Sequence, residues 1–125
     1  METINTPSKG ARISGWILTA LTTLFFLVDG IMKIAKAQVA LDGSASLGWP
    51  QELVPVIGYL LTIATILHLI PRTALLGAIL VTAYLGGAVA IMMRLGTPYA
   101  FPIIFCALMW AGFALRNPRV RQLLF

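Results

Sequence analysis

Four long apolar runs make up most of the chain. They cover about residues 13–34, 51–70, 73–93 and 98–115, and most charged residues lie between them. A helix needs about 20 residues to cross a bilayer core, with a range of about 17–25. The runs lack the polar face of a soluble helix and the strict alternation of membrane β-strands. The pattern therefore predicts an all-α membrane protein with a four-helix transmembrane bundle over residues 13–116.

Short polar segments between the runs predict the turns. Pro71-Arg72 separates the second run from the third, and the stretch from Arg94 to Pro98 separates the third from the fourth. Asn117-Pro118 ends the fourth run, because proline cannot continue a helix. The one long connection covers residues 35–48 and is rich in Gly and Ser. We expect residues 1–12 and 117–125 to form short tails, the second of them basic.

Composition supports a membrane setting. The chain has 125 residues, of which 59% are hydrophobic and 10% are charged, whereas soluble domains carry about 25% charged residues. The net charge of +5 could suggest nucleic acid. A nucleic-acid site, however, needs basic residues clustered on one face, and here they lie between apolar runs, as they do beside membranes. We therefore expect membrane lipids, and no nucleic acid, as partners.

The basic residues also predict an orientation. One side of the predicted membrane holds six of them and the other holds three, namely Lys33, Lys36 and Arg94. Cytoplasmic loops are enriched in Lys and Arg, so the side with six is expected to be cytoplasmic. Both termini then lie in the cytoplasm, as four spans require. Trp16 and Trp49 fit an aromatic belt at the two opposite interfaces.

Asp29 and Lys33 are the charged residues inside the first run. An ionisable residue within a span is a functional-site hypothesis by default, and the spacing of four places both on one helix face. Two interpretations stay open. Lys33 either neutralises Asp29 and extends to the interface, or the pair lines a polar cavity that opens outward.

Topology brings further polar residues to the same end. Glu52 begins the second predicted helix and Arg94 ends the third, so the two could join the first pair in a cluster of two acids and two bases. Tyr59 and Tyr84 lie deeper, and their hydroxyls need partners in hydrocarbon, so both are predicted to point inward. The predicted ligand-binding residues are Asp29, Lys33, Glu52, Tyr59, Tyr84 and Arg94.

The third run carries two pairs of small residues at a spacing of four, Ala83 with Gly87 and Gly86 with Ala90. Such pairs let neighbouring helices approach closely in membranes, so these residues are predicted to mediate helix packing. His68 is the only histidine and Cys106 the only cysteine. One of each provides neither a zinc site nor an intramolecular dithiol. We expect no metal and no intrinsic cofactor, and a structural role for His68.

Three stretches resemble the DoxX-like family of small bacterial membrane proteins: residues 29–33, residues 82–90 continuing to Arg94, and Trp110 followed by residues 115–119. The resemblance implies a four-helix, multi-pass protein of the bacterial inner membrane. It also implies a link to sulfur and thiol redox through a quinone or a redox partner, and a distant eukaryotic branch is similar to assembly chaperones. Many relatives carry a His where this chain has Ile91 and Met92, so a role for that His does not carry over.

These observations leave three functions open. The bundle could hold a small amphipathic ligand, a lipid or a quinone, in an outward-facing cavity. It could instead support a membrane redox complex or act as an assembly chaperone, docking a partner protein or a second copy of the chain through the small-residue face. The third hypothesis is an enzyme that uses Asp29 as acid or base.

Overall fold

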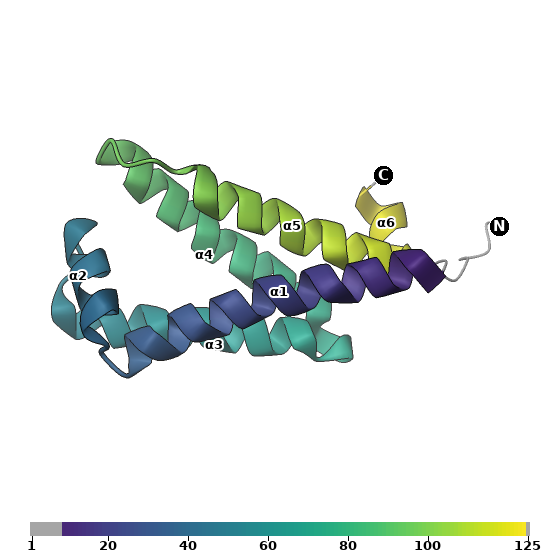
Figure 1. Cartoon of the computed structure of the whole chain (residues 1–125), viewed down its shortest axis with the longest axis horizontal. Coiled ribbons are helices and arrows are strands. Elements are labelled where there is room, and N and C mark those ends of the chain that lie inside the picture. Colours follow the sequence, from purple (N-terminus) through teal and green to yellow (C-terminus); the bar gives the residue numbers. More distant parts are fainter. Residues whose placement is uncertain (1–8, 125) are drawn as a thin grey trace.

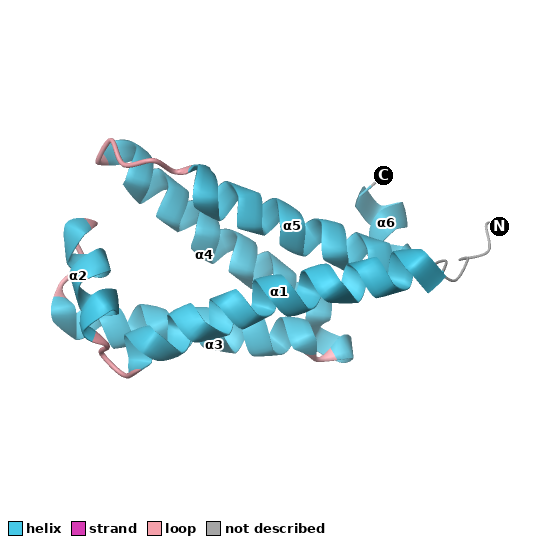
Figure 2. Cartoon of the chain, viewed as in Figure 1, coloured by secondary structure: helices cyan, strands magenta, loops and turns pink. Residues whose placement is uncertain are grey.

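The computed structural model describes residues 9–124, which form helices joined by short turns (Figure 1, Figure 2). The elements are α1 (Lys9–Ile34), α2 (Gln38–Ser46), the 3-10 turn η1 (Gln51–Leu53), α3 (Val54–Leu69), the 3-10 turn η2 (Pro71–Thr73), α4 (Ala74–Arg94), α5 (Ala100–Arg116) and α6 (Pro118–Leu124). No strand occurs in the described range, so the fold is all-α. Residues 1–8 of the predicted N-terminal tail, and Phe125, lie outside the described residues.

The four long helices pack side by side. α1 contacts both α3 and α5, and α4 contacts the same two helices from the other side. α4 and α5 diverge from α1 and α3 toward the end of the molecule where α2 lies (Figure 1). α2 contacts α1, α3 and η1 but makes no backbone contact with α4 or α5. The molecule is therefore tightly closed at one end and spread apart at the other.

Three segments are long and apolar enough to cross a bilayer: Lys9–Ile34, Gln51–Leu69 and Pro71–Arg94. α5 is also apolar but has only 17 residues. The outward faces of the long helices expose large aliphatic side chains, among them Leu21, Leu24, Ile63 and Ile104, each more than half exposed. A surface of this kind is unfavourable in water and suited to lipid.

Glycines bring the long helices together at three places. Gly15 of α1 lies against Gly112 of α5, and Gly30 of α1 lies against Gly58 of α3. In α4, Gly77 packs on the backbone of His68 at the turn from α3. A Cβ at any of these positions would lie within 3 Å of atoms of the neighbouring helix. These glycines allow the close approach between helices that was predicted for the small residues of the third run.

The prediction that Ala83, Gly86, Gly87 and Ala90 pack against other helices of this chain is wrong. A Cβ at Gly86 or Gly87 would meet no atom within 4 Å, and both alanines are exposed. The reason is the divergence of α4 from its neighbours, since the buried residues of α4 end at Leu85. Small residues favour close packing only where another helix is near, and sequence spacing alone does not show which helix is near.

Two short helices lie where connections or tails were predicted. α6 begins at Asn117-Pro118, where the Asn117 side chain accepts a hydrogen bond from the backbone N–H of Arg119 at 3.1 Å. Asparagine is a good N-cap and proline suits the first helical position, so the signal that ends α5 also starts α6. α2 lies in the Gly- and Ser-rich connection, whose composition does not favour a helix; its contacts with α1 and α3 hold it.

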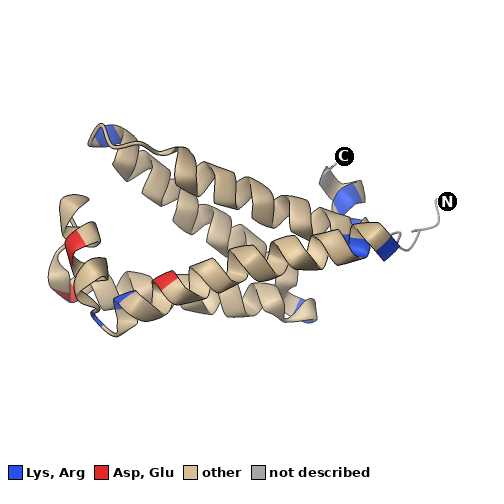
Figure 3. Ribbon diagram, viewed as in Figure 1, with Lys and Arg blue, Asp and Glu red and all other residues tan. Residues whose placement is uncertain are grey.

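Charge divides between the two ends (Figure 3). The end with the start of α1, η2 and α6 carries six basic residues: Lys9, Arg12, Arg72, Arg116, Arg119 and Arg121. The opposite end carries three basic residues and every described acidic residue, namely Asp29, Asp42 and Glu52. Within the described range, the first end is thus strongly positive and the second is balanced.

Candidate functional site

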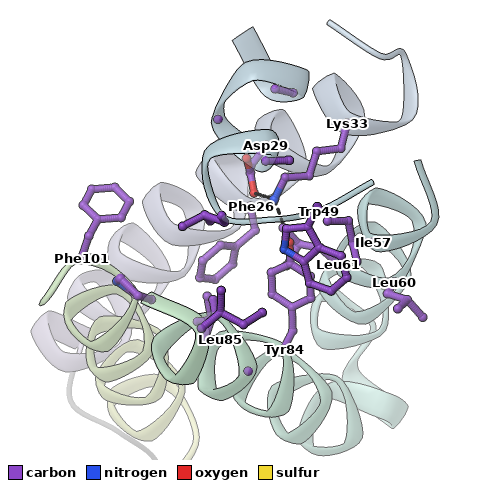
Figure 4. A pocket seen from close by; sticks show the side chains of 18 of the residues that line it. Phe26, Asp29, Lys33, Trp49, Ile57, Leu60, Leu61, Tyr84, Leu85 and Phe101 are labelled. Atoms are coloured by element: carbon purple, nitrogen blue, oxygen red, sulfur yellow. Dashed lines mark hydrogen bonds and ion pairs between the residues drawn. The ribbon is translucent and has the colours of Figure 1, made fainter. Parts of the chain in front are cut away.

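A cavity of about 620 Å³ lies between the long helices at the balanced end (Figure 4). All four long helices contribute to its wall, and α2 with the segment that follows it covers one side. Small-molecule sites typically measure about 300–1,000 Å³ and are mostly apolar with a few convergent polar groups. This cavity has that size and that character.

The polar groups of the cavity form a short chain. Lys33 Nζ donates a hydrogen bond to Asp29 Oδ2 at 3.0 Å and another to the Tyr84 hydroxyl at 2.8 Å. The Lys33 side chain is 15% exposed and that of Asp29 is 36% exposed. Lys33 therefore neutralises Asp29, but it turns across the cavity toward α4 and does not extend to the interface. The chain connects α1 to α4, which have no backbone contact with each other.

The direction of Lys33 follows from the packing of α1 on α3. Gly58 lies directly against this part of α1, and a Cβ there would stand 2.7 Å from Lys33 Cβ. Because Gly58 has no side chain, the stem of Lys33 runs past α3 and its ammonium group reaches the cavity. The spacing of four residues then brings Asp29 to the same group.

Apolar side chains form the rest of the wall. Phe26, Leu61 and Leu85 are buried and line the cavity beyond the polar chain. Phe25 of α1 packs on Phe105 of α5 with ring centroids 4.5 Å apart, and Phe101 lies 4.5 Å from Phe105. Aromatic rings at such distances attract one another. They close the contact between α1 and α5 beside the cavity.

The structure brings together three of the six predicted ligand-binding residues: Asp29, Lys33 and Tyr84. Glu52 in η1 and Arg94 at the end of α4 are exposed and do not line the cavity. The predicted cluster of two acids and two bases is therefore wrong, because α3 and α4 diverge at this end. Ligand binding by the three remaining residues stays a prediction.

Tyr59 also differs from its predicted position. Its side chain is 54% exposed and lies outside the cavity lining, so the predicted inward direction is wrong. The neighbouring Gly58 and Leu61 are buried toward the other helices. A helix turns about 100° per residue, so Tyr59 faces away from them.

Two polar residues of the cavity were not predicted. Ser44 of α2 and Trp49, which was interpreted as an interface anchor, both line it. Ser44 is only 4% exposed. Both lie in or beside a segment that resembled a loop, and no periodic pattern indicated that this segment folds over the cavity. Figure 4 shows Trp49 directed toward the same space as Tyr84 and the Asp29–Lys33 pair.

A separate polar centre lies at the positive end. The Arg116 guanidinium stacks on the rings of Trp16 and Phe113, 4.3 Å and 4.8 Å from their centroids. Its Nε donates to the hydroxyl of Thr19 at 2.9 Å. His68 Nδ1 lies 2.9 Å from the carbonyl oxygen of Ala74 and donates to it, so Nε2 accepts from Arg116 at 3.3 Å.

This centre connects α1, α3 and α5 through hydrogen bonds and ring contacts. His68 is 1% exposed, and its two ring nitrogens are both engaged by protein groups. The arrangement fits the structural role predicted for His68. Its side-chain partner is Arg116 of α5, which lies 48 residues further along the chain.

The model of the DoxX-like family matches residues 17–112, which begin within α1 and end in the last turns of α5. No curated protein and no solved structure matches the chain. The matched range contains Asp29, Lys33 and Tyr84, two of the three segments able to cross a bilayer, and most of the first such segment. This small membrane protein therefore belongs to the DoxX-like family.

Proposed function

We propose that the protein binds one amphipathic small molecule, a lipid or a quinone, within the cavity. The polar head would lie at the chain formed by Asp29, Lys33 and Tyr84. The apolar part would lie against the buried side chains of Phe26, Leu61 and Leu85. The observation that carries the proposal is an apolar cavity of about 620 Å³ with one hydrogen-bonded polar end, as in known small-molecule sites.

The proposal includes a membrane arrangement. We place α5 in the bilayer as a fourth span, since its 17 residues equal the lower limit of about 17 for a transmembrane helix. The end with six basic residues would face the cytoplasm of a bacterial inner membrane. The cavity would then open at the outer side, where the ligand reaches it from the membrane.

An exposed face of α4 favours a second candidate function. Gly86 and Ala90 are exposed, and small residues on a lipid-facing helix permit close contact with another membrane helix. A redox enzyme, a receptor that needs an assembly partner, or a second copy of the chain could dock there. The enzyme hypothesis is weaker, because the carboxylate of Asp29 is held in an ion pair with Lys33.

Adjacent glycines of α4 allow a matched test. Gly87 lines the cavity, whereas Gly86 does not, and a Cβ at either would meet no atom within 4 Å. We expect Gly87→Leu to fill the cavity and expel the ligand, and Gly86→Leu to leave the ligand bound. Native mass spectrometry of protein released gently from membranes measures the bound mass. Melting temperatures of the delipidated variants show whether both remain folded.

Either of two results would contradict ligand binding. One is a wild-type protein that carries no small molecule under the gentlest release conditions. The other is a folded Gly87→Leu variant that keeps the wild-type mass at full occupancy. Loss of a co-purifying membrane protein in Gly86→Leu alone would favour the docking function instead.

A further inference from the structure

The polar end of the cavity has unused hydrogen-bonding capacity. A carboxylate has two acceptor oxygens and a lysine ammonium has three donors. Asp29 uses Oδ2 with Lys33, while its Oδ1 has no hydrogen-bond partner within residues 9–124. Lys33 uses two donors, on Asp29 and Tyr84. One acceptor on Asp29 and one donor on Lys33 are therefore free.

Unused polar groups also face the cavity from the side of α2. Ser44 is 4% exposed, and its hydroxyl has no hydrogen bond to any described residue. The indole N–H of Trp49 likewise has no partner in the described part of the chain. Neither atom is fully enclosed by protein; among the described residues, the enclosed side-chain oxygen without a partner is that of Thr62, which does not line the cavity. The Ser44 hydroxyl and the Trp49 N–H therefore remain open to a partner, and their common position on the cavity wall places that partner inside the cavity.

The charge of the residues that line the cavity limits which head group a bound molecule can have. Among the described residues that line the cavity, Asp29 and Lys33 are the only acidic and basic side chains, and they form an ion pair. The described cavity therefore has no net charge to offset an ionic head group. A charge placed in an apolar site without a counter-charge is strongly unfavourable. A phosphate or carboxylate head would also lie close to the carboxylate of Asp29.

We propose that the cavity takes a lipid with a neutral head group that both accepts and donates hydrogen bonds, as a monoacylglycerol does. This inference rests on the proposed ligand-binding function. The ester carbonyl accepts from Lys33 and Trp49, and a hydroxyl donates to Asp29 Oδ1. Ser44 donates to or accepts from the second hydroxyl, and the acyl chain occupies the apolar part of the cavity.

Three probes with the same oleoyl chain test the head group. They are 1-oleoylglycerol, methyl oleate, which accepts but does not donate, and oleate, which is an anion. We expect 1-oleoylglycerol to bind the delipidated full-length protein about tenfold or more tightly than either of the others, since one hydrogen bond of about 1.4 kcal/mol corresponds to a factor of ten. Native mass spectrometry at increasing probe concentration measures the three affinities.

Matched variants locate the effect on the wall. Ser44→Ala and Trp49→Phe each remove a polar group while largely keeping shape, and each is expected to weaken 1-oleoylglycerol binding several-fold. Ser46→Ala is the control, because its hydroxyl bonds to the carbonyl of Gly43 and does not line the cavity. Unchanged melting temperatures of the delipidated variants separate loss of binding from loss of folding.

The possible failures are distinguishable. Oleate or methyl oleate binding as tightly as 1-oleoylglycerol would overturn the head-group inference and leave cavity binding intact. Unchanged binding in both Ser44→Ala and Trp49→Phe would also overturn it. If no probe binds but wild type carries a native mass that Gly87→Leu loses, only the head-group inference fails. If wild type carries no native mass either, the proposed function fails with it.

Discussion

A half-buried cation among apolar helices needs several partners at once, and Arg116 has four. Two aromatic rings cover the faces of its guanidinium, while its N–H groups reach Thr19 and His68. Arginine is suited to this environment because its planar group stacks on rings and donates in fixed directions. Lysine offers a single compact charge and does neither.

We therefore expect Arg116→Ala to lower the free energy of unfolding by about 2 kcal/mol, because it strands the Thr19 hydroxyl and His68 Nε2 and removes the ring contacts. Arg116→Lys should recover only a minor part of that loss. Equilibrium unfolding in mixed micelles measures both changes. Arg119→Ala is the control, since Arg119 is exposed on α6. A lysine variant as stable as wild type would show that charge alone suffices at this position.

At the level of elements, helix contacts depend on which glycines meet a neighbour. α1 crosses α3 where Gly30 and Gly58 oppose each other, and a Cβ on Gly58 would lie 2.7 Å from the carbonyl oxygen of Gly30. Gly86 faces no neighbouring atom. Replacing glycine by alanine is therefore expected to affect stability in opposite directions at Gly58 and at Gly86.

Gly58→Ala is expected to push α3 away from α1 and to destabilise the protein by about 1–3 kcal/mol, the usual cost of overpacking. It should also displace the stem of Lys33 and weaken ligand retention. Gly86→Ala should be neutral or stabilising by up to about 1 kcal/mol, because alanine is the better helix former. Unfolding in mixed micelles compares the two variants. Equal effects would mean that the helices are not in close contact at Gly58.

The ends of α1 and α4 differ in how clearly the local sequence marks them. α1 and α4 both finish in the same backbone motif, with a residue of positive φ just after the helix. α4 uses Gly96 at φ 72°, the usual choice for this motif. α1 uses Lys36 at φ 56°. Because a lysine rarely adopts this conformation, the sequence does not mark this residue as the end of a helix. The end of α4 was therefore recognisable from residues 94–98, whereas the turn that leads from α1 to α2 was not.

The distribution of charge over the whole molecule predicts its orientation. The positive end carries six basic residues and no described acidic residue, and the other end is balanced. Basic segments are retained on the cytoplasmic side. A fluorescent protein fused after Phe125 should be fluorescent in cells, and alkaline phosphatase at the same position should be inactive.

A fusion inserted at Gly96, in the turn between α4 and α5, is the internal control and should give the opposite pattern. Active phosphatase after Phe125 would reverse the orientation. Active phosphatase at both positions would mean that α5 does not cross the bilayer, and the chain would then have three spans.

Sequence determined those features that depend on neighbours along the chain or on total composition. Long apolar runs and prolines were sufficient for the four long helices and their main breaks, because helix formation and membrane burial respond to local hydropathy. The Asp29–Lys33 pair was also predictable, since a spacing of four places two side chains together on any helix. The resemblance to the DoxX-like family likewise came from short stretches of sequence.

Tertiary structure alone decided which way each helix faces and where the helices separate. In lipid every face of a span is apolar, so hydropathy does not distinguish the inward Tyr84 from the outward Tyr59. Because α4 and α5 diverge from α1 and α3, Gly87 lines the cavity and does not pack against a neighbouring helix as predicted. It also lets α2 bring Ser44 and Trp49 over that cavity, because their placement depends on contacts between segments far apart in sequence.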